Sequence, residues 1–464
     1  MLSKRNDLNN LNTNKFNNSS IKNTFLIIFG AFLGQVATLL LTPILTRIYL
    51  PEDFGNWGLF ISFISIFGGV VNLKYDLAIM LPKSDDDAFN ILLIATSISL
   101  LVSLVFGLSI YVTKDFISKL LNWNNFSSII FYIFSSILFR GIINSFNLWN
   151  MRKKNFGIYS LYLFLYSFFT FTVPALFGIL GFRQGSNLVI GSFIGIFLSL
   201  FFILLHFFRN YSRLFESLNI KRFRTNLLRF INFPKYSALS VLFNEASWQI
   251  PSFAISIYFS KAELGFFTLS LGILKLPLSQ FGSAVGHVTF QKTSEAKHNT
   301  NIDVIVEEVF SLLVKIITPI IFFVLVLSPD IFKNILGEIY IESGIYLQIL
   351  AIWIFVWFIS IPLSHIYFVM EKQKTDLMIN IVIFITRLVS FIIGAVLNNI
   401  YIALGLFSLT GILVYGFLVL KSMNLAGINN KKIIDILFNS ILKSIPLLLM
   451  LFLFPKLKIM ECRN

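Results

Sequence analysis

The sequence has 464 residues, of which 56% are hydrophobic and only 13% are charged. A soluble domain carries about 25% charged residues, and a soluble protein of this length could not hide so much apolar surface. The composition therefore indicates an all-α integral membrane protein whose main solvent is lipid. The formal net charge of +15 does not indicate nucleic-acid binding, because the basic residues lie in short segments between apolar stretches.

The first 23 residues are rich in asparagine and lack the short apolar core and cleavage site of a signal peptide. We expect residues 1–23 to form a disordered cytoplasmic tail. A membrane-spanning helix needs about 20 apolar residues, and twelve such stretches follow the tail. They lie at 24–46, 57–73, 89–112, 127–148, 158–180, 187–208, 238–259, 265–289, 308–328, 346–369, 377–397 and 400–420.

The longest polar interruption, 209–237, divides these stretches into two sets of six. We therefore expect an N-lobe at 24–208, a basic cytoplasmic linker at 209–237 and a C-lobe at 238–420. The C-terminal segment, 421–464, contains one more apolar stretch at 433–454. Two interpretations of that stretch stay open: a thirteenth span, or a helix lying on the membrane surface.

Lysine and arginine determine the expected orientation. With the N-terminus inside, the cytoplasmic segments between spans hold 23 basic residues and the opposite segments hold six. The positive-inside rule then places the N-terminus in the cytoplasm of a multi-pass protein. The family resemblance given below implies that this membrane is the bacterial inner membrane.

A short internal repeat appears at equivalent points in the two halves. Asp53–Leu59 reads DFGNWGL and Glu263–Leu269 reads ELGFFTL, so both have an acid, an apolar residue, a glycine, an aromatic residue and a leucine in the same register. The copies lie six spans apart and therefore share their orientation. This predicts two lobes related by a pseudo-two-fold axis along the membrane normal.

No signature of an enzyme is present, and no catalytic residue, cofactor site or metal site is expected. The four histidines have no paired spacing, no glycine-rich phosphate loop occurs, and the single cysteine, Cys462, excludes an intrachain disulfide.

Charged residues inside the expected spans are the best candidates for a functional site, because each costs about 2.5–3.5 kcal/mol near the bilayer centre. Lys275 and Arg387 lie near the middle of their spans and are expected to line a central cavity. Arg140 and Lys315 either line that cavity or extend towards the membrane surface. Glu245 is either a site for a coupling ion or the counter-ion of one of these cations.

A cavity lined by lysine and arginine selects anionic cargo, and arginine binds phosphate in bidentate geometry. Arg47, just beyond the first span, completes the set of candidate cavity residues. The residues themselves thus predict a transporter of an anionic or phosphate-bearing solute.

Several runs also resemble a known family. They are Thr42–Gly55, Lys74–Ile79, Leu81–Asn90, Phe233–Ser237 and Leu276–Lys292. In combination, over roughly 24–420, they are similar to the polysaccharide-biosynthesis flippases, the Wzx-type members of the MATE/MOP exporter superfamily. The resemblance implies two six-helix lobes forming a V around a cationic cavity.

The implied cargo is an undecaprenyl-pyrophosphate-linked oligosaccharide, moved from the cytoplasmic to the periplasmic leaflet for O-antigen or capsule synthesis. The lipid bilayer and a polysaccharide polymerase machinery are the implied partners. Two other functions remain open at this point: a cation-coupled drug exporter of the same superfamily, and a membrane polymerase or ligase of surface glycans. The drug exporter would need acidic residues in its lobes, and the enzyme would need a large external region.

Overall fold

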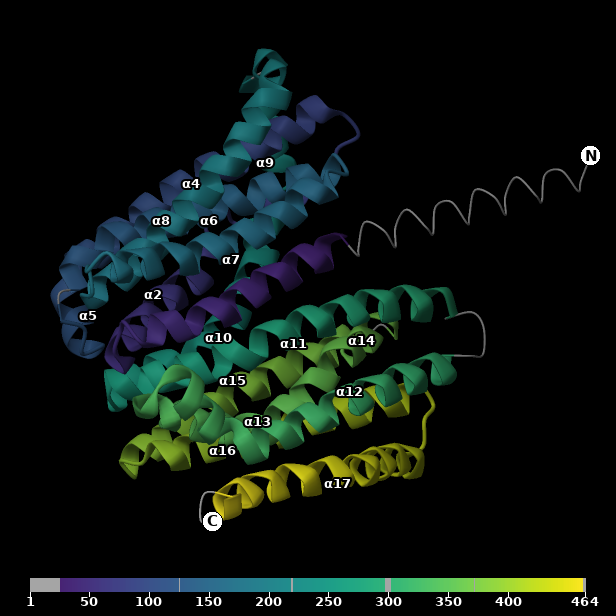
Figure 1. Cartoon of the computed structure of the whole chain (residues 1–464). Helices are drawn as coiled ribbons and strands as arrows, with labels where there is room; N and C mark the ends of the chain where they lie inside the picture. The colour runs from purple at the N-terminus through teal and green to yellow at the C-terminus, as the bar shows by residue number, and fades with distance from the viewer. Residues whose placement is uncertain (1–25, 125, 218–219, 297–301, 371, 462–464) are drawn as a thin grey trace, which may run out of the picture.

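The structure is a computed structural model that describes residues 26–461 apart from 125, 218–219, 297–301 and 371. Two bundles of long helices lie against each other, and no strand occurs in this described part (Figure 1). The tail expected at 1–23 and Cys462 lie outside the described residues.

The N-lobe consists of six long helices and two short ones. The long ones are the first helix (Leu26–Thr46), α2 (Pro51–Gly68), α4 (Asp85–Val112), α6 (Phe126–Arg152), α7 (Phe156–Ile179) and α8 (Gly185–Tyr211). The short ones, in the connections, are α3 (Tyr75–Ala78) and α5 (Lys114–Leu120).

The C-lobe repeats this arrangement. Its long helices are α10 (Ala238–Tyr258), α11 (Lys261–Ala296), α12 (Ile302–Ile331), α13 (Ile341–Leu363), α15 (Gln373–Val396) and α16 (Ile400–Leu425). Short helical turns complete it: η3 (Phe332–Leu336), η4 (Glu338–Tyr340) and α14 (His365–Val369). The predicted all-α fold of two six-helix lobes is confirmed.

The end of the bundle at which the first helix begins, at Leu26, is here called the proximal end. The end at which that helix finishes, at Thr46, is the distal end. The helices alternate in direction, so α2 and α11 both begin at the distal end, whereas α10 begins at the proximal end (Figure 1).

Ten helices of the described chain are long and apolar enough to cross a membrane, and α2 and α10 are not among them. These two helices carry polar side chains that face the space between the lobes, including Ser62 and Ser65 in α2 and Asn244 and Gln249 in α10. Polar residues are retained inside a membrane bundle where they face a cavity. The two long helices that fall short of this hydropathy therefore mark the inner surfaces, where the two lobes face each other.

Prolines bend several of the long helices. They lie inside α7, α10, α11, α12 and α13, as the positions of Pro174, Pro251, Pro277, Pro319 and Pro362 predict. Each proline frees the carbonyl four residues earlier, and inside a membrane a neighbour must bind that carbonyl. Below Pro251, the freed carbonyl oxygen of Ser247 accepts a hydrogen bond from Arg387 (3.1 Å). A buried arginine thus stabilises the bend of α10.

The segment between the lobes, expected as a linker at 209–237, is mostly helical. After α8 come η1 (Ser212–Ser217), α9 (Ile220–Arg229) and η2 (Phe233–Ser237). The Tyr75 hydroxyl donates to the carbonyl oxygen of Leu227 (2.9 Å), and Arg222 pairs with Asp86 (3.5 Å). These contacts hold α9 on the proximal end of the N-lobe.

The C-terminal segment forms α17 (Asn430–Glu461). This helix packs along α12 and runs beside the C-lobe helices rather than across their ends (Figure 1). Lys432 of α17 forms an ion pair with Glu307 of α12. Both residues lie near the proximal end, so the pair fixes the register in which α17 starts.

Candidate functional site between the lobes

The acidic residue of each repeat copy caps the helix that the copy begins. The backbone N–H of Leu50 donates to Asp53 Oδ2 (2.9 Å), and that of Ser260 donates to Glu263 Oε2 (2.8 Å). A carboxylate in this position satisfies a backbone donor at the helix start and interacts favourably with the helix dipole. The same residue type thus builds the same helix start in both lobes.

The glycines of the repeat bring these two helix starts into direct contact. A Cβ atom at Gly55 would collide with the carbonyl oxygen of Lys261, and one at Gly265 would collide with that of Pro51. Only glycine lets the two backbones approach so closely. The duplicated motif therefore forms a pseudo-symmetric crossing of α2 and α11 at the distal end.

Side chains of the C-lobe reinforce this crossing by binding carbonyl oxygens of the N-lobe. Lys261 Nζ and Ser256 Oγ both donate to the carbonyl oxygen of Leu121. The Tyr340 hydroxyl, 0% exposed as a residue, donates to the carbonyl oxygen of Tyr49. We call this set of contacts, with the glycine crossing, the distal closure.

A cavity of about 470 Å³ lies between the lobes on the proximal side of the distal closure. The first helix, α2, α10 and α11 form most of its wall. Hydroxyl and amide side chains line it, among them Thr38, Thr42, Ser62, Ser65, Asn244 and Gln249. Its charged lining residues are Glu245 and Lys275, both predicted as site residues from the sequence.

Lys275 projects from α11 onto an indole ring in the cavity wall. Its Nζ lies 3.8 Å from the centroid of the Trp248 ring. No carboxylate among the described residues forms an ion pair with this ammonium within 4.0 Å. A desolvated cation–π contact contributes up to about 2 kcal/mol, and no direct ion pair neutralises the charge. The ammonium can therefore bind an anion that enters the cavity.

Arg387, from α15, contacts the same indole ring, with its Cζ 4.2 Å from the Trp248 centroid. Its guanidinium is 4% exposed and is not part of the cavity lining. One nitrogen donates to both the carbonyl and the hydroxyl oxygen of Ser247 (3.1 Å each), and another donates to the Tyr415 hydroxyl (3.0 Å). Arg387 is thus a buried, hydrogen-bonded charge behind the cavity wall.

Glu245 lies between charges of the two lobes. It belongs to α10, and a Cβ atom on Gly69 of the N-lobe would lie 3.4 Å from its Cγ. Lys275 and Arg140 are the positive charges that act most strongly on its carboxylate. This arrangement favours the counter-ion interpretation of Glu245, shared between one cation from each lobe.

Arg140 itself points from α6 towards tyrosines of α7. Its Nη1 donates to the Tyr162 hydroxyl (3.5 Å), and its Cζ lies 5.3 Å from the Tyr166 ring centroid. The other two cations predicted from the sequence lie elsewhere: Lys315 is exposed on α12, and Arg47 is exposed at the distal turn after the first helix. Neither lines the cavity.

Sequence reasoning missed the neutral part of the wall, above all Trp248 and Gln249. A signal for it exists in α10, where Glu245, Gln249 and Ser252 recur at i, i+4 and i+7 and so share one helix face. All three line the cavity. Within the described residues, no group of three or more His, Cys, Asp or Glu side chains is placed to hold a metal ion.

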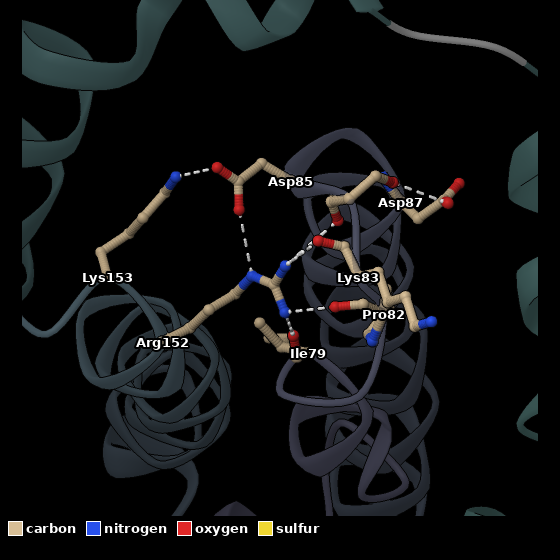
Figure 2. A network of polar contacts seen from close by, with 8 residues as sticks. Ile79, Pro82, Lys83, Asp85, Asp87, Arg152 and Lys153 are labelled. Carbon is tan, nitrogen blue, oxygen red and sulfur yellow. Dashed lines mark hydrogen bonds and ion pairs between the residues drawn. The ribbon is translucent and has the colours of Figure 1, made fainter. Parts of the chain in front are cut away.

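A second polar cluster lies at the proximal end and is structural (Figure 2). Arg152, the last residue of α6, donates to the carbonyl oxygens of Ile79 (3.2 Å) and Pro82 (2.8 Å) and to Asp85 (3.2 Å). Lys153 also pairs with Asp85. A guanidinium with several donors in a fixed plane can hold a whole turn in this way, so the cluster fixes the loop between α2 and α4.

Comparisons with known proteins agree with this architecture. No curated protein sequence matches the chain. Among solved structures, the lipid II flippase MurJ in an inward closed conformation superposes with a TM-score of 0.64 at 14% identity, covering 97% of this chain and 99% of that one. An inward-facing multidrug resistance MATE family transporter of the MOP superfamily superposes with a TM-score of 0.65 at 15% identity, covering 84% of this chain and 95% of that one. An outward-facing transporter of the same description superposes with a TM-score of 0.55 at 14% identity, covering 88% of this chain and 96% of that one.

These likenesses establish the fold, and a family model establishes the family. The model described as "Polysaccharide biosynthesis protein" matches residues 44–345, which is more than half of the chain. Its match spans both copies of the repeat and all the residues that line the cavity except Thr38, Thr42 and Trp357. The solved structures with this fold are described as a flippase and a transporter rather than as enzymes, and the chain belongs to the polysaccharide biosynthesis protein family.

Proposed function

We propose that this protein is a flippase that moves undecaprenyl-pyrophosphate-linked oligosaccharide repeat units from the cytoplasmic to the periplasmic leaflet. The products would serve the synthesis of a surface polysaccharide such as O-antigen or capsule, by way of a polymerase. Membership of the polysaccharide biosynthesis family and the flippase-like fold support the proposal.

The observation that carries the proposal is the state of Lys275. Its ammonium lies in the cavity between the lobes, on Trp248 and without an ion pair within 4.0 Å among the described residues. A buried cation is costly unless an anion or water compensates it. A pyrophosphate entering the cavity would supply that anion, whereas a cationic drug would be repelled by Lys275.

The direction of transport rests on the orientation of the chain. If the basic segments face the cytoplasm, the proximal end does so too, and the distal closure seals the cavity from the periplasm. We predict that a reporter fused at residue 220 reports cytoplasm and that one fused at residue 183 reports periplasm. A periplasmic signal at 220 would invert the proposed direction.

A deletion strain tests the function itself. We expect undecaprenyl-linked repeat units to accumulate with their sugars on the cytoplasmic face, and surface polysaccharide to be lost. Restoring the wild-type gene should remove the accumulated lipid and bring back the surface polysaccharide. A gene carrying Lys275→Ala should do neither. Accumulation on the periplasmic face would indicate a polymerase instead. Sensitivity to cationic drugs with normal surface polysaccharide would indicate a drug exporter.

A further inference from the structure

Most of the cavity wall consists of side chains that phosphate binding does not require. Trp57 and Phe171 come from the N-lobe, and Trp248 and Trp357 come from the C-lobe. A pyranose ring has an apolar face of C–H groups and a rim of hydroxyl groups. Flat aromatic rings next to amide and hydroxyl side chains match both parts of such a ring. The neutral wall therefore has the chemistry of a carbohydrate site.

Trp57 is an aromatic ring of this wall that neighbouring side chains hold in place. Its Nε1 donates to Ser192 Oγ (2.8 Å). Its ring also makes edge contacts with Phe171 (centroids 5.5 Å apart, planes at 84°) and Phe54 (6.2 Å, 86°). A ring fixed on its nitrogen and by its neighbours loses little conformational entropy when a ligand stacks on it.

Gln249 supplies polar atoms that the protein leaves unused. The Ser62 hydroxyl has one proton and lies within hydrogen-bond distance of Gly58 O (2.8 Å) and of the Gln249 side-chain oxygen (2.9 Å). This single contact engages only one side of the amide, whichever way the amide is turned. No other described residue hydrogen-bonds the Gln249 side chain, which faces the cavity.

Trp57, Ser62 and Gln249 all line the cavity. Trp57 and Ser62 belong to α2 of the N-lobe, and Ser62 contacts Gln249 of α10 in the C-lobe. The stacking ring and the free amide thus come from opposite lobes. A sugar bound here would contact both lobes at once.

We propose that Trp57, Ser62 and Gln249 form a carbohydrate subsite that binds a neutral pyranose of the cargo, separately from the anion site at Lys275. The subsite rests on the proposed function. It adds to that function the residues that distinguish one repeat unit from another. Gln249 forms hydrogen bonds with the hydroxyl or acetamido groups of the sugar, and Trp57 stacks against the apolar face of the sugar.

The test compares two cargos in proteoliposomes of the purified full chain. One is undecaprenyl pyrophosphate without sugar, and the other carries a single N-acetylhexosamine on the same pyrophosphate. We expect the wild type to move the sugar-bearing lipid faster. Trp57→Leu and Gln249→Leu should each slow the sugar-bearing lipid about tenfold, which equals about 1.4 kcal/mol, and leave the sugar-free lipid unchanged. Trp57→Phe, which keeps a stacking ring, should lose less.

Lys275→Ala provides the matched comparison because it should slow both lipids alike. An equal loss for both lipids in the Trp57 and Gln249 variants would overturn the subsite, as would a wild type that does not distinguish the two lipids. Transport of neither lipid by the wild type would instead refute the proposed function. Thermal unfolding of each variant in detergent excludes misfolding as the cause.

Discussion

At the distal end the lobes meet backbone to backbone, whereas about one helical turn further along α2 they leave a cavity. Both regions begin in the same repeat. Gly55 and Gly265 form the crossing, and the next aligned pair of large residues, Trp57 and Phe267, already lines the cavity. In the closure, Lys261 and Tyr340 of the C-lobe each donate a hydrogen bond to a carbonyl oxygen of the N-lobe. In the cavity, by contrast, Lys275 has no ion-pair partner among the described residues.

The difference shows how a duplicated segment separates two tasks. The first half of each copy has the same types of residue, with an acid that caps the helix and a glycine that allows the crossing. A pseudo-symmetric contact requires this match, because each copy packs against the other. The second half diverges, with Gly58 in one copy and Thr268 in the other, where cargo need not be symmetric.

The largest effect is expected from filling the distal closure. Gly55→Leu should prevent the backbones from crossing, at an overpacking cost of about 3 kcal/mol that would reduce the closed population roughly a hundredfold. We expect flipping in proteoliposomes to fall accordingly. Gly405→Leu is the matched control, since a Cβ atom at Gly405 meets nothing within 4 Å. Wild-type flipping by Gly55→Leu would show that the transport cycle does not need this closure.

The next largest effect is expected in the cavity. Lys275→Ala should reduce polysaccharide export at least tenfold while the protein still reaches the membrane. Its unfolding temperature should change little, because no ion pair within 4.0 Å is lost among the described residues. Lys275→Arg, which keeps the charge, should restore much of the export. Normal export by Lys275→Ala would mean that the cavity cation does not bind the cargo.

Arg387→Ala should show whether Arg387 stabilises the fold or binds the cargo. The substitution leaves the freed carbonyl of Ser247 and the Tyr415 hydroxyl without a donor, at about 1–3 kcal/mol for a buried polar group. We expect a lower unfolding temperature in detergent and a several-fold loss of export that follows the loss of folded protein. A loss of export at unchanged stability would show that Arg387 contacts the cargo directly.

The smallest effect is expected outside both regions. Truncation after residue 430 removes α17, which packs along α12 and forms neither the distal closure nor the cavity. Both six-helix lobes are complete before that point. We therefore expect most of the flipping activity to remain, measured per molecule of folded protein. Complete loss of activity in a stable truncated protein would assign α17 a part in transport.

The sequence predicted the helices, the two lobes and the repeat because hydrophobic length and period determine them locally. It also pointed to Lys275 and Glu245, which line the cavity and whose role in binding stays a prediction. It did not predict that Arg387 lies behind the cavity wall, because the rotation of α15 and the bend of α10 at Pro251 are set by packing between helices. The proposed subsite at Gln249 was missed because neutral polar residues cost less to insert into a membrane than charged ones. Their positions in a span therefore do not distinguish a binding residue from a packing residue.

The Arg152 cluster also has a consequence for the order in which the protein is made. The turn that it holds includes Ile79, but Arg152 follows Ile79 by 73 residues. At about 5–20 residues per second, roughly 4–15 seconds of translation separate the two. During that interval the turn before α4 has its acidic residues and open carbonyls but not its arginine. The first three long helices must therefore enter the membrane without the hydrogen bonds of Arg152. The turn is stabilised only when α6 has been made.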